Sequence, residues 1–105
     1  MEIRSASRRI ERTMIKITRA RHGEASTIEL WFSDDTTGTY DMAPIIKRDT
    51  VLTRPLRDPA YFCSFYLELG ALAWPNGLEF SPAALHAALL ESGRLLALPR
   101  LAHGG

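Results

Sequence analysis

Trp74-Pro75-Asn76-Gly77 joins a large aromatic residue to strong turn-forming residues, and this stretch decides the fold. Proline fixes its own φ and holds the residue before it in an extended conformation, while asparagine and glycine tolerate positive φ. We therefore expect a strand to end at Trp74 and the chain to reverse direction directly after it. The stretch defines a fold and carries no reactive group.

Several segments upstream of this turn alternate between apolar and polar residues, which is the pattern of half-buried strands. The first begins near Thr13 and is joined to a strand over 27–33 as a hairpin through His22-Gly23-Glu24. A third strand is expected over 37–42. The alternation over 63–69 predicts a further strand with Cys63, Phe65, Leu67 and Leu69 inward. Gly70 separates this strand from a short one that ends at Trp74.

Three proline-containing segments predict helical turns. Two are short, near 43–48 and 58–62, and the main helix covers 83–92 behind Ser81-Pro82, a cap followed by proline. Gly93 is expected to cap this helix, and 94–98 either continue it or form a second short turn. The prediction is an α+β fold: a four- to five-stranded antiparallel meander sheet packed by one C-terminal helix.

The composition is that of a single globular domain. The chain has 105 residues, of which 46% are hydrophobic and 24% charged. Residues 1–12 are expected to form a basic, flexible arm and 13–105 the domain. A single cysteine allows no internal disulfide, and the apolar runs are far too short to span a bilayer, so a cytoplasmic location is expected.

The net charge of +1 hides an asymmetry, because seven of the 13 basic residues fall within the first 21 positions, against two acidic residues. Five arginines form the best candidate contact to nucleic acid: Arg8, Arg9, Arg12, Arg19 and Arg21. The alternative is a solvated arm. The isoelectric point near 8.0 and the lack of an interleaved aromatic residue favour that alternative.

Catalytic and metal motifs are not recognisable. Cys63 lies on the apolar side of its expected strand, which favours core packing over a role as a nucleophile. The histidines lack the spacing of a zinc site, and turn chemistry accounts for the aspartates better than acid–base work does. The residues weighed are His22, His86, His103, Asp34, Asp35, Asp41 and Asp49. We therefore expect no enzyme, cofactor or metal.

Two groups of apolar residues exceed what one small sheet can cover. Trp31 falls on the opposite strand face from Ile28, Leu30 and Phe32. The C-terminal segment has more leucines than one helix stripe uses: Leu90, Leu95, Leu96 and Leu98. With Trp31 they form the candidate protein interface, most simply that of a homodimer. The alternative is that a curled sheet or the arm covers them within the monomer.

The order of motifs resembles the bacterial domain of unknown function family 2442. The motifs are Phe32-Ser33-Asp34, the segment 40–44 reading Tyr-Asp-Met-Ala-Pro, the segment 56–62 reading Leu-Arg-Asp-Pro-Ala-Tyr-Phe, Trp74-Pro75-Asn76-Gly77 and a helix beginning at Pro82. The resemblance covers about 13–86. Asp35 departs from the pattern, which usually has glycine there. The resemblance implies an α+β domain and a regulatory rather than catalytic role, since some members carry an appended helix-turn-helix domain.

Other small members of that family are encoded beside another small protein, as in toxin–antitoxin pairs. Two hypotheses follow. In the first, the chain is a non-enzymatic protein-interaction component, a homodimer or the antitoxin-like partner of another small protein. In the second, it is a transcriptional regulator that contacts nucleic acid through its basic arm.

Overall fold

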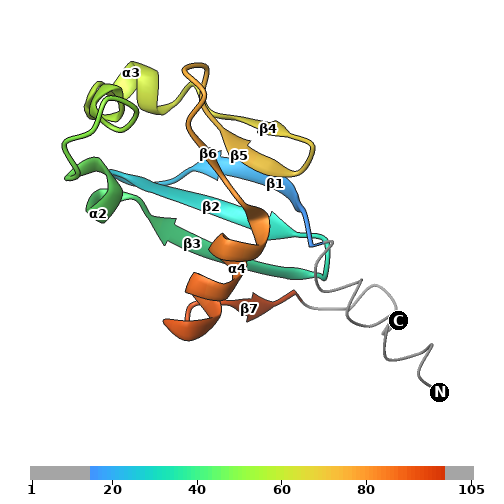
Figure 1. The fold of residues 1–105 in the computed structure, drawn as a ribbon. Coiled ribbons are helices and arrows are strands. Elements are labelled where there is room, and N and C mark those ends of the chain that lie inside the picture. Colours follow the sequence, from blue (N-terminus) through green and yellow to red (C-terminus); the bar gives the residue numbers. More distant parts are fainter. Residues whose placement is uncertain (1–14, 99–105) are drawn as a thin grey trace.

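Two antiparallel sheets and four short helices make up the computed structural model, which describes residues 15–98 (Figure 1). The first sheet has the strand order β1 (Ile17–His22), β2 (Thr27–Phe32), β3 (Thr36–Asp41) and β7 (Leu96–Ala97). The second has the order β4 (Tyr66–Glu68), β5 (Ala71–Ala73) and β6 (Glu79–Phe80). The helices are α2 (Ala43–Ile46), the 3-10 helix η1 (Arg54–Arg57), α3 (Pro59–Phe62) and α4 (Pro82–Glu91).

The α+β class, the first hairpin and the helices α2, α3 and α4 confirm the sequence prediction. The strands divide between two sheets because α2, η1 and α3 intervene between β3 and β4. Two strands, β6 and β7, were not predicted, since two residues are too few to show an alternating pattern. Ser81 caps α4 as expected, its hydroxyl accepting a hydrogen bond from the amide of Ala84.

The prediction of helix or turn over 94–98 is wrong, because the chain leaves α4 at Gly93 and returns to the sheet as β7. Gly93 has a φ of +74°, and its amide donates to Leu90. The amide of Arg94 donates to Leu89 at 2.9 Å, completing a Schellman motif that turns the chain away from the helix axis. β7 then pairs antiparallel with the start of β3.

The turn motif joins the second sheet to the helical segment. Trp74 is fully buried, and its indole N–H donates to the carbonyl of Phe62 at 3.0 Å. The amide N–H of Asn76 donates to the hydroxyl of Tyr61, and the Asn76 side chain donates to the carbonyl of Leu52. The chain reverses after Trp74, as predicted, with the Gly77 amide donating to the Trp74 carbonyl.

The core lies between the inner face of the first sheet, the second sheet and α4. Its buried members include Leu30 and Phe32 from β2, Leu72 from β5, and Leu85 and Leu89 from α4. Cross-strand neighbours share a face, so the inner face of the first sheet can be followed from Ala20 through Leu30 to Gly38. All of this apolar packing therefore uses one face of the first sheet.

The inward placement of Cys63 and Leu69 is wrong. Cys63 is exposed at the end of α3, because β4 begins only at Tyr66 and the segment before it is helical. Leu69 is 89% exposed because it forms, with Gly70, the two-residue turn between β4 and β5. Of the alternating set, Phe65 and Leu67 do pack against the core.

Leu69→Asn should stabilise the protein by about 1 kcal/mol. Leu69 and Gly70 both have positive φ, at 51° and 85°, which is the conformation of a type I′ turn that favours Asn-Gly. Because the leucine side chain is exposed, little packing is lost. Urea unfolding of both proteins measures the change, and an unchanged or lower midpoint would contradict this reading of the turn.

Candidate functional site

One row of side chains crosses the outer face of the first sheet, opposite the core. Arg19 pairs with Trp31, Trp31 with Thr37, and Thr37 with Leu96. Directly paired residues of antiparallel strands point to the same face, so all four side chains lie together. We call this set the outer row. None of its members belongs to the core cluster, and Leu96 is 62% exposed.

Trp31 lies half-buried under two arginines. The guanidinium carbons of Arg19 and Arg21 lie 4.7 and 5.8 Å from the centre of its ring. Arg21 also forms an ion pair with Glu29, its cross-strand neighbour, while no ion pair of Arg19 occurs among residues 15–98. No aromatic residue is interleaved among the arginines along the chain, because strand pairing, not chain order, brings Trp31 beside them.

The other predicted interface residues are not in the outer row. Leu95 packs against the core and Leu98 is half-buried, its amide donating to the carbonyl of Asp35. Leu90 is 61% exposed, but it belongs to α4, which packs on the inner face through Leu89. The structure thus brings Trp31 and Leu96 together and separates both from Leu90. Arg8, Arg9 and Arg12, like His103, lie outside the described residues.

An imidazole–carboxylate pair joins α4 to the turn between β2 and β3. The His86 Nε2 and Asp34 Oδ2 atoms lie 2.9 Å apart, and the His86 ring stands edge-on to Phe32. Partial burial acts to raise the pKa of Asp34, but hydrogen bonds from Thr36 and His86 and the charge of His86 outweigh it, so the pKa lies below its ordinary value. Sequence spacing gave no sign of this pair, whose members are 52 positions apart.

The lowered pKa of Asp34 predicts a pH-dependent contribution to stability. The folded state favours the ionised carboxylate, so the contribution is present above the ordinary value of 3.8 and is lost as the pH falls through the folded-state pKa. Asp34→Asn should cost up to about 1 kcal/mol near neutral pH, and the difference should shrink below about pH 4. Urea unfolding across this pH range measures it. A difference that keeps growing as the pH falls below about 4 would contradict the assignment.

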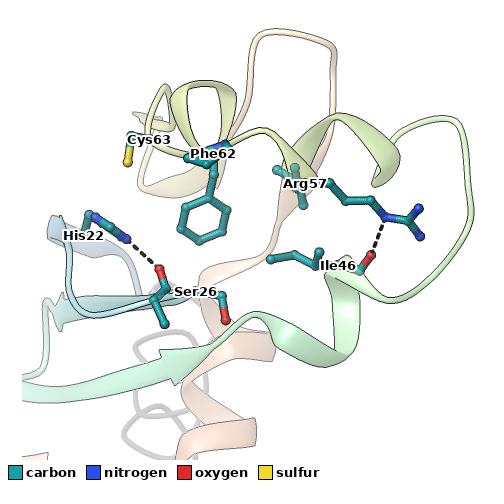
Figure 2. A pocket seen from close by; sticks show the side chains of 9 residues that line it. His22, Ser26, Ile46, Arg57, Phe62 and Cys63 are labelled. Atoms are coloured by element: carbon teal, nitrogen blue, oxygen red, sulfur yellow. Dashed lines mark hydrogen bonds between the residues drawn. The ribbon is translucent and has the colours of Figure 1, made fainter.

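An apolar cavity of about 410 Å³ opens between the turn after β1 and the helices α2, η1 and α3 (Figure 2). Phe62 points into it, and Ile46 and the His22 ring stand on either side. His22 Nε2 lies 2.8 Å from the carbonyl of Ala25, and Cys63 forms part of the wall. The lining comes from separate segments, so no sequence motif announces the cavity.

Arg57 gives this cavity its one cationic lining residue. Its Nε donates to the carbonyl of Ile46 at 3.3 Å, which turns the guanidinium along the outer side of the wall (Figure 2). The cavity can therefore accept an apolar group, and none of the described lining residues aims a charged group into it. Among residues 15–98, no cluster of three metal-ligating side chains occurs, and no helix is long and apolar enough to cross a membrane.

The model of one protein family, described as protein of unknown function (DUF2442), matches residues 17–99. The chain is a DUF2442 protein. No curated protein and no solved structure shows significant similarity to it. The family match extends through β7, beyond the resemblance seen in the sequence, and so includes every strand described above.

The motifs that mark this DUF2442 protein build its core. Leu56 and Phe62 are buried, as is Trp74, and Asn76 links their segments. Asp35, where the resemblance implies a glycine, has a φ of +66°, a conformation that glycine adopts most readily. None of these motif residues belongs to the outer row, so the candidate surface of this DUF2442 protein uses residues that its motifs do not include.

Proposed function

We propose that this protein is a non-enzymatic protein-interaction module that binds through the outer row. The partner is a second copy of the chain or another small protein, in an antitoxin-like pairing. The observation that carries the proposal is the placement of Trp31 and Leu96 on one sheet face, with Thr37 between them, while all core packing uses the other face.

The chemistry of the outer row suits a protein partner. Tryptophan and arginine are the residues most enriched at the energetic centres of protein interfaces. Stacking on Trp31 orients the Arg19 guanidinium before binding, which lowers the entropy lost when it pairs with a carboxylate of a partner. Leu96 adds an exposed apolar group at the end of the row. Together these residues offer an apolar centre with a charged border.

Leu96→Glu should weaken self-association, or binding of the natural partner, at least tenfold, because a charge would be buried in the interface. Sedimentation of the full chain measures self-association. Quantitative capture from the native host, with partners identified by mass spectrometry, measures binding of the natural partner. Leu69→Glu is the matched control, since it places the same charge at an exposed leucine in the turn between β4 and β5, outside the row. A monomer whose captured proteins are the same for both variants would contradict the proposal.

A second candidate function has a specific observation in its favour. Arginines flanking an aromatic ring on an open sheet face can stack bases and neutralise phosphates, so Arg19, Arg21 and Trp31 also support contact with nucleic acid. The ion pair of Arg21 with Glu29 weakens this reading, because it offsets one of the two charges. Salt-dependent binding of single-stranded or duplex DNA that is lost on Arg19→Ala would favour it.

A further inference from the structure

Part of the edge of β3 has no neighbouring strand among the described residues. β7 pairs only with Thr36 and Thr37, whereas β3 continues to Asp41. Residues 38–41 are paired on their other side with β2. The edge that follows β7 is therefore open over about three residues, from Thr39 to Asp41.

The backbone polar groups of Thr39 and Asp41 point to this open edge. In an antiparallel ladder, alternate residues direct both backbone groups to the same side. The Met42 amide donates to the carbonyl of Ser26, so the even-numbered residues of β3 bond to β2. The Leu98 amide donates to the carbonyl of Asp35, so the odd-numbered residues face β7 and the edge beyond it.

The segment that precedes β7 does not continue the pairing along this edge, and the end of α4 explains why. Continuing the register of β7 would place Arg94 opposite Thr39. The Arg94 amide is instead committed to Leu89 in the Schellman motif at the end of α4. The Arg94 N–H can serve either the helix cap or a longer β7, and in the structure it serves the cap. The backbone carbonyl of Thr39 consequently remains available to another donor.

Two cavities flank the open edge, and both are lined by Thr39 and Arg94. The first, of about 300 Å³, has apolar walls that include Pro44, Ala88 and Leu89. The second, of about 410 Å³, includes Leu96 of the outer row. The side chains of a strand point alternately to its two faces, so a strand added here would place successive side chains in the two cavities.

We propose that an extended segment of a partner protein adds to β3 along Thr39–Asp41. The inference rests on the proposed function, protein binding, and extends its surface from the outer row to the adjoining edge. The partner residue opposite Thr39 points to the same face as the outer row. We expect this partner residue to be acidic, because Arg94 lines both cavities and forms no ion pair among residues 15–98. The next residue, opposite Tyr40, is apolar and enters the cavity beside Ala88.

The first test is hydrogen exchange of the free full chain followed by NMR. The amides of Thr39 and Asp41 should exchange quickly, while those of Tyr40 and Met42, bonded to β2, should be protected. Slow exchange of Thr39 and Asp41 in the monomer would overturn the inference, because the edge would already be occupied. Protection that rises with protein concentration would assign the edge to a second copy and would also overturn it.

The second test adds an acetylated, amidated peptide of sequence Thr-Val-Thr-Val-Glu, whose last residue lies opposite Thr39 when the peptide adds antiparallel, so that the peptide ends before β7. Binding should protect the Thr39 and Asp41 amides. N-methylation of the glutamate amide, which faces β3, should reduce affinity about tenfold, whereas N-methylation of a valine amide, which faces away, should not. Absence of binding, or equal loss with both methylated peptides, would overturn the inference.

A variant of the protein separates this inference from the proposed function. Thr39→Pro removes only the N–H at the edge, a position where strands tolerate proline, so it should keep the fold and lose the peptide. If Leu96→Glu abolishes association while Thr39→Pro associates as well as wild type, the outer row is supported as the binding surface and strand addition at the β3 edge is overturned. If Thr39→Pro abolishes peptide binding while Leu96→Glu leaves association unchanged, strand addition at the β3 edge is supported and binding through the outer row is contradicted.

Discussion

Trp74→Ala should lower the free energy of unfolding by about 3–5 kcal/mol, a large part of the total for a domain of this size. The side chain is fully buried, and the rings of Phe65 and Phe80 stand edge-on to it with centroids about 6 Å away. Truncation leaves a cavity among three aromatic rings and removes the donor for the Phe62 carbonyl. Urea unfolding followed by circular dichroism measures the loss.

Trp74→Phe keeps an aromatic ring but removes the hydrogen bond and part of the buried ring, and its expected cost is about 1–3 kcal/mol, because the buried carbonyl of Phe62 loses its partner. The other tryptophan is the matched control. Trp31→Phe, on the outer row, should cost less than about 1 kcal/mol, since it keeps a ring beneath Arg19 and removes no core contact. Equal losses at the two tryptophans would contradict the division of the first sheet into a core face and a binding face.

Gly38→Val should destabilise the protein by about 3 kcal/mol. A Cβ atom at Gly38 would lie 2.9 Å from the Leu89 Cδ1 atom and 2.9 Å from the Arg94 carbonyl oxygen. Both contacts are too short to keep, so α4 and the segment before β7 would have to move away from β3. The expected result in NMR is the loss of the β3–β7 pairing together with a lower unfolding midpoint.

Thr39→Val is the control for Gly38→Val, because it places a valine in the same strand on the opposite face and should change stability by less than about 0.5 kcal/mol. A double variant sharpens the test. Leu89→Ala costs about 2–5 kcal/mol alone, but together with Gly38→Ala the cost should be less than the sum, since the new methyl group occupies vacated space. Strict additivity would show that the close approach does not limit this position.

The parts of the fold that local chemistry determines could be predicted from the sequence. Ser81-Pro82 begins α4, and Trp74-Pro75-Asn76-Gly77 reverses the chain, because caps and turns depend on residues adjacent in sequence. Cys63 and Leu69 were misplaced because the alternating pattern was extended over residues that form a helix end and a tight turn. β7 was missed because a Schellman motif and strand pairing, not propensity, determine its conformation.

The candidate surface could be predicted only in part. Alternation along β2 is enough to place Trp31 on the face opposite Leu30, so its outward position was foreseen. Its arginine neighbours, and Leu96 two strands away, depend on register, which the sequence does not reveal without the turn geometry. The same limit applies to the Asp34–His86 pair and to the open edge of β3, both of which arise from contacts between distant segments.

The most direct test of the outer row is photo-crosslinking from two matched positions. Leu96 and Leu90 are almost equally exposed, at 62% and 61%, but only Leu96 lies in the row. Benzoylphenylalanine placed at either position, followed by irradiation in the native host, identifies what each side chain contacts. We predict a discrete protein adduct from position 96 and none from position 90. Adducts from position 90 alone, or nucleic acid in place of protein at position 96, would contradict the account.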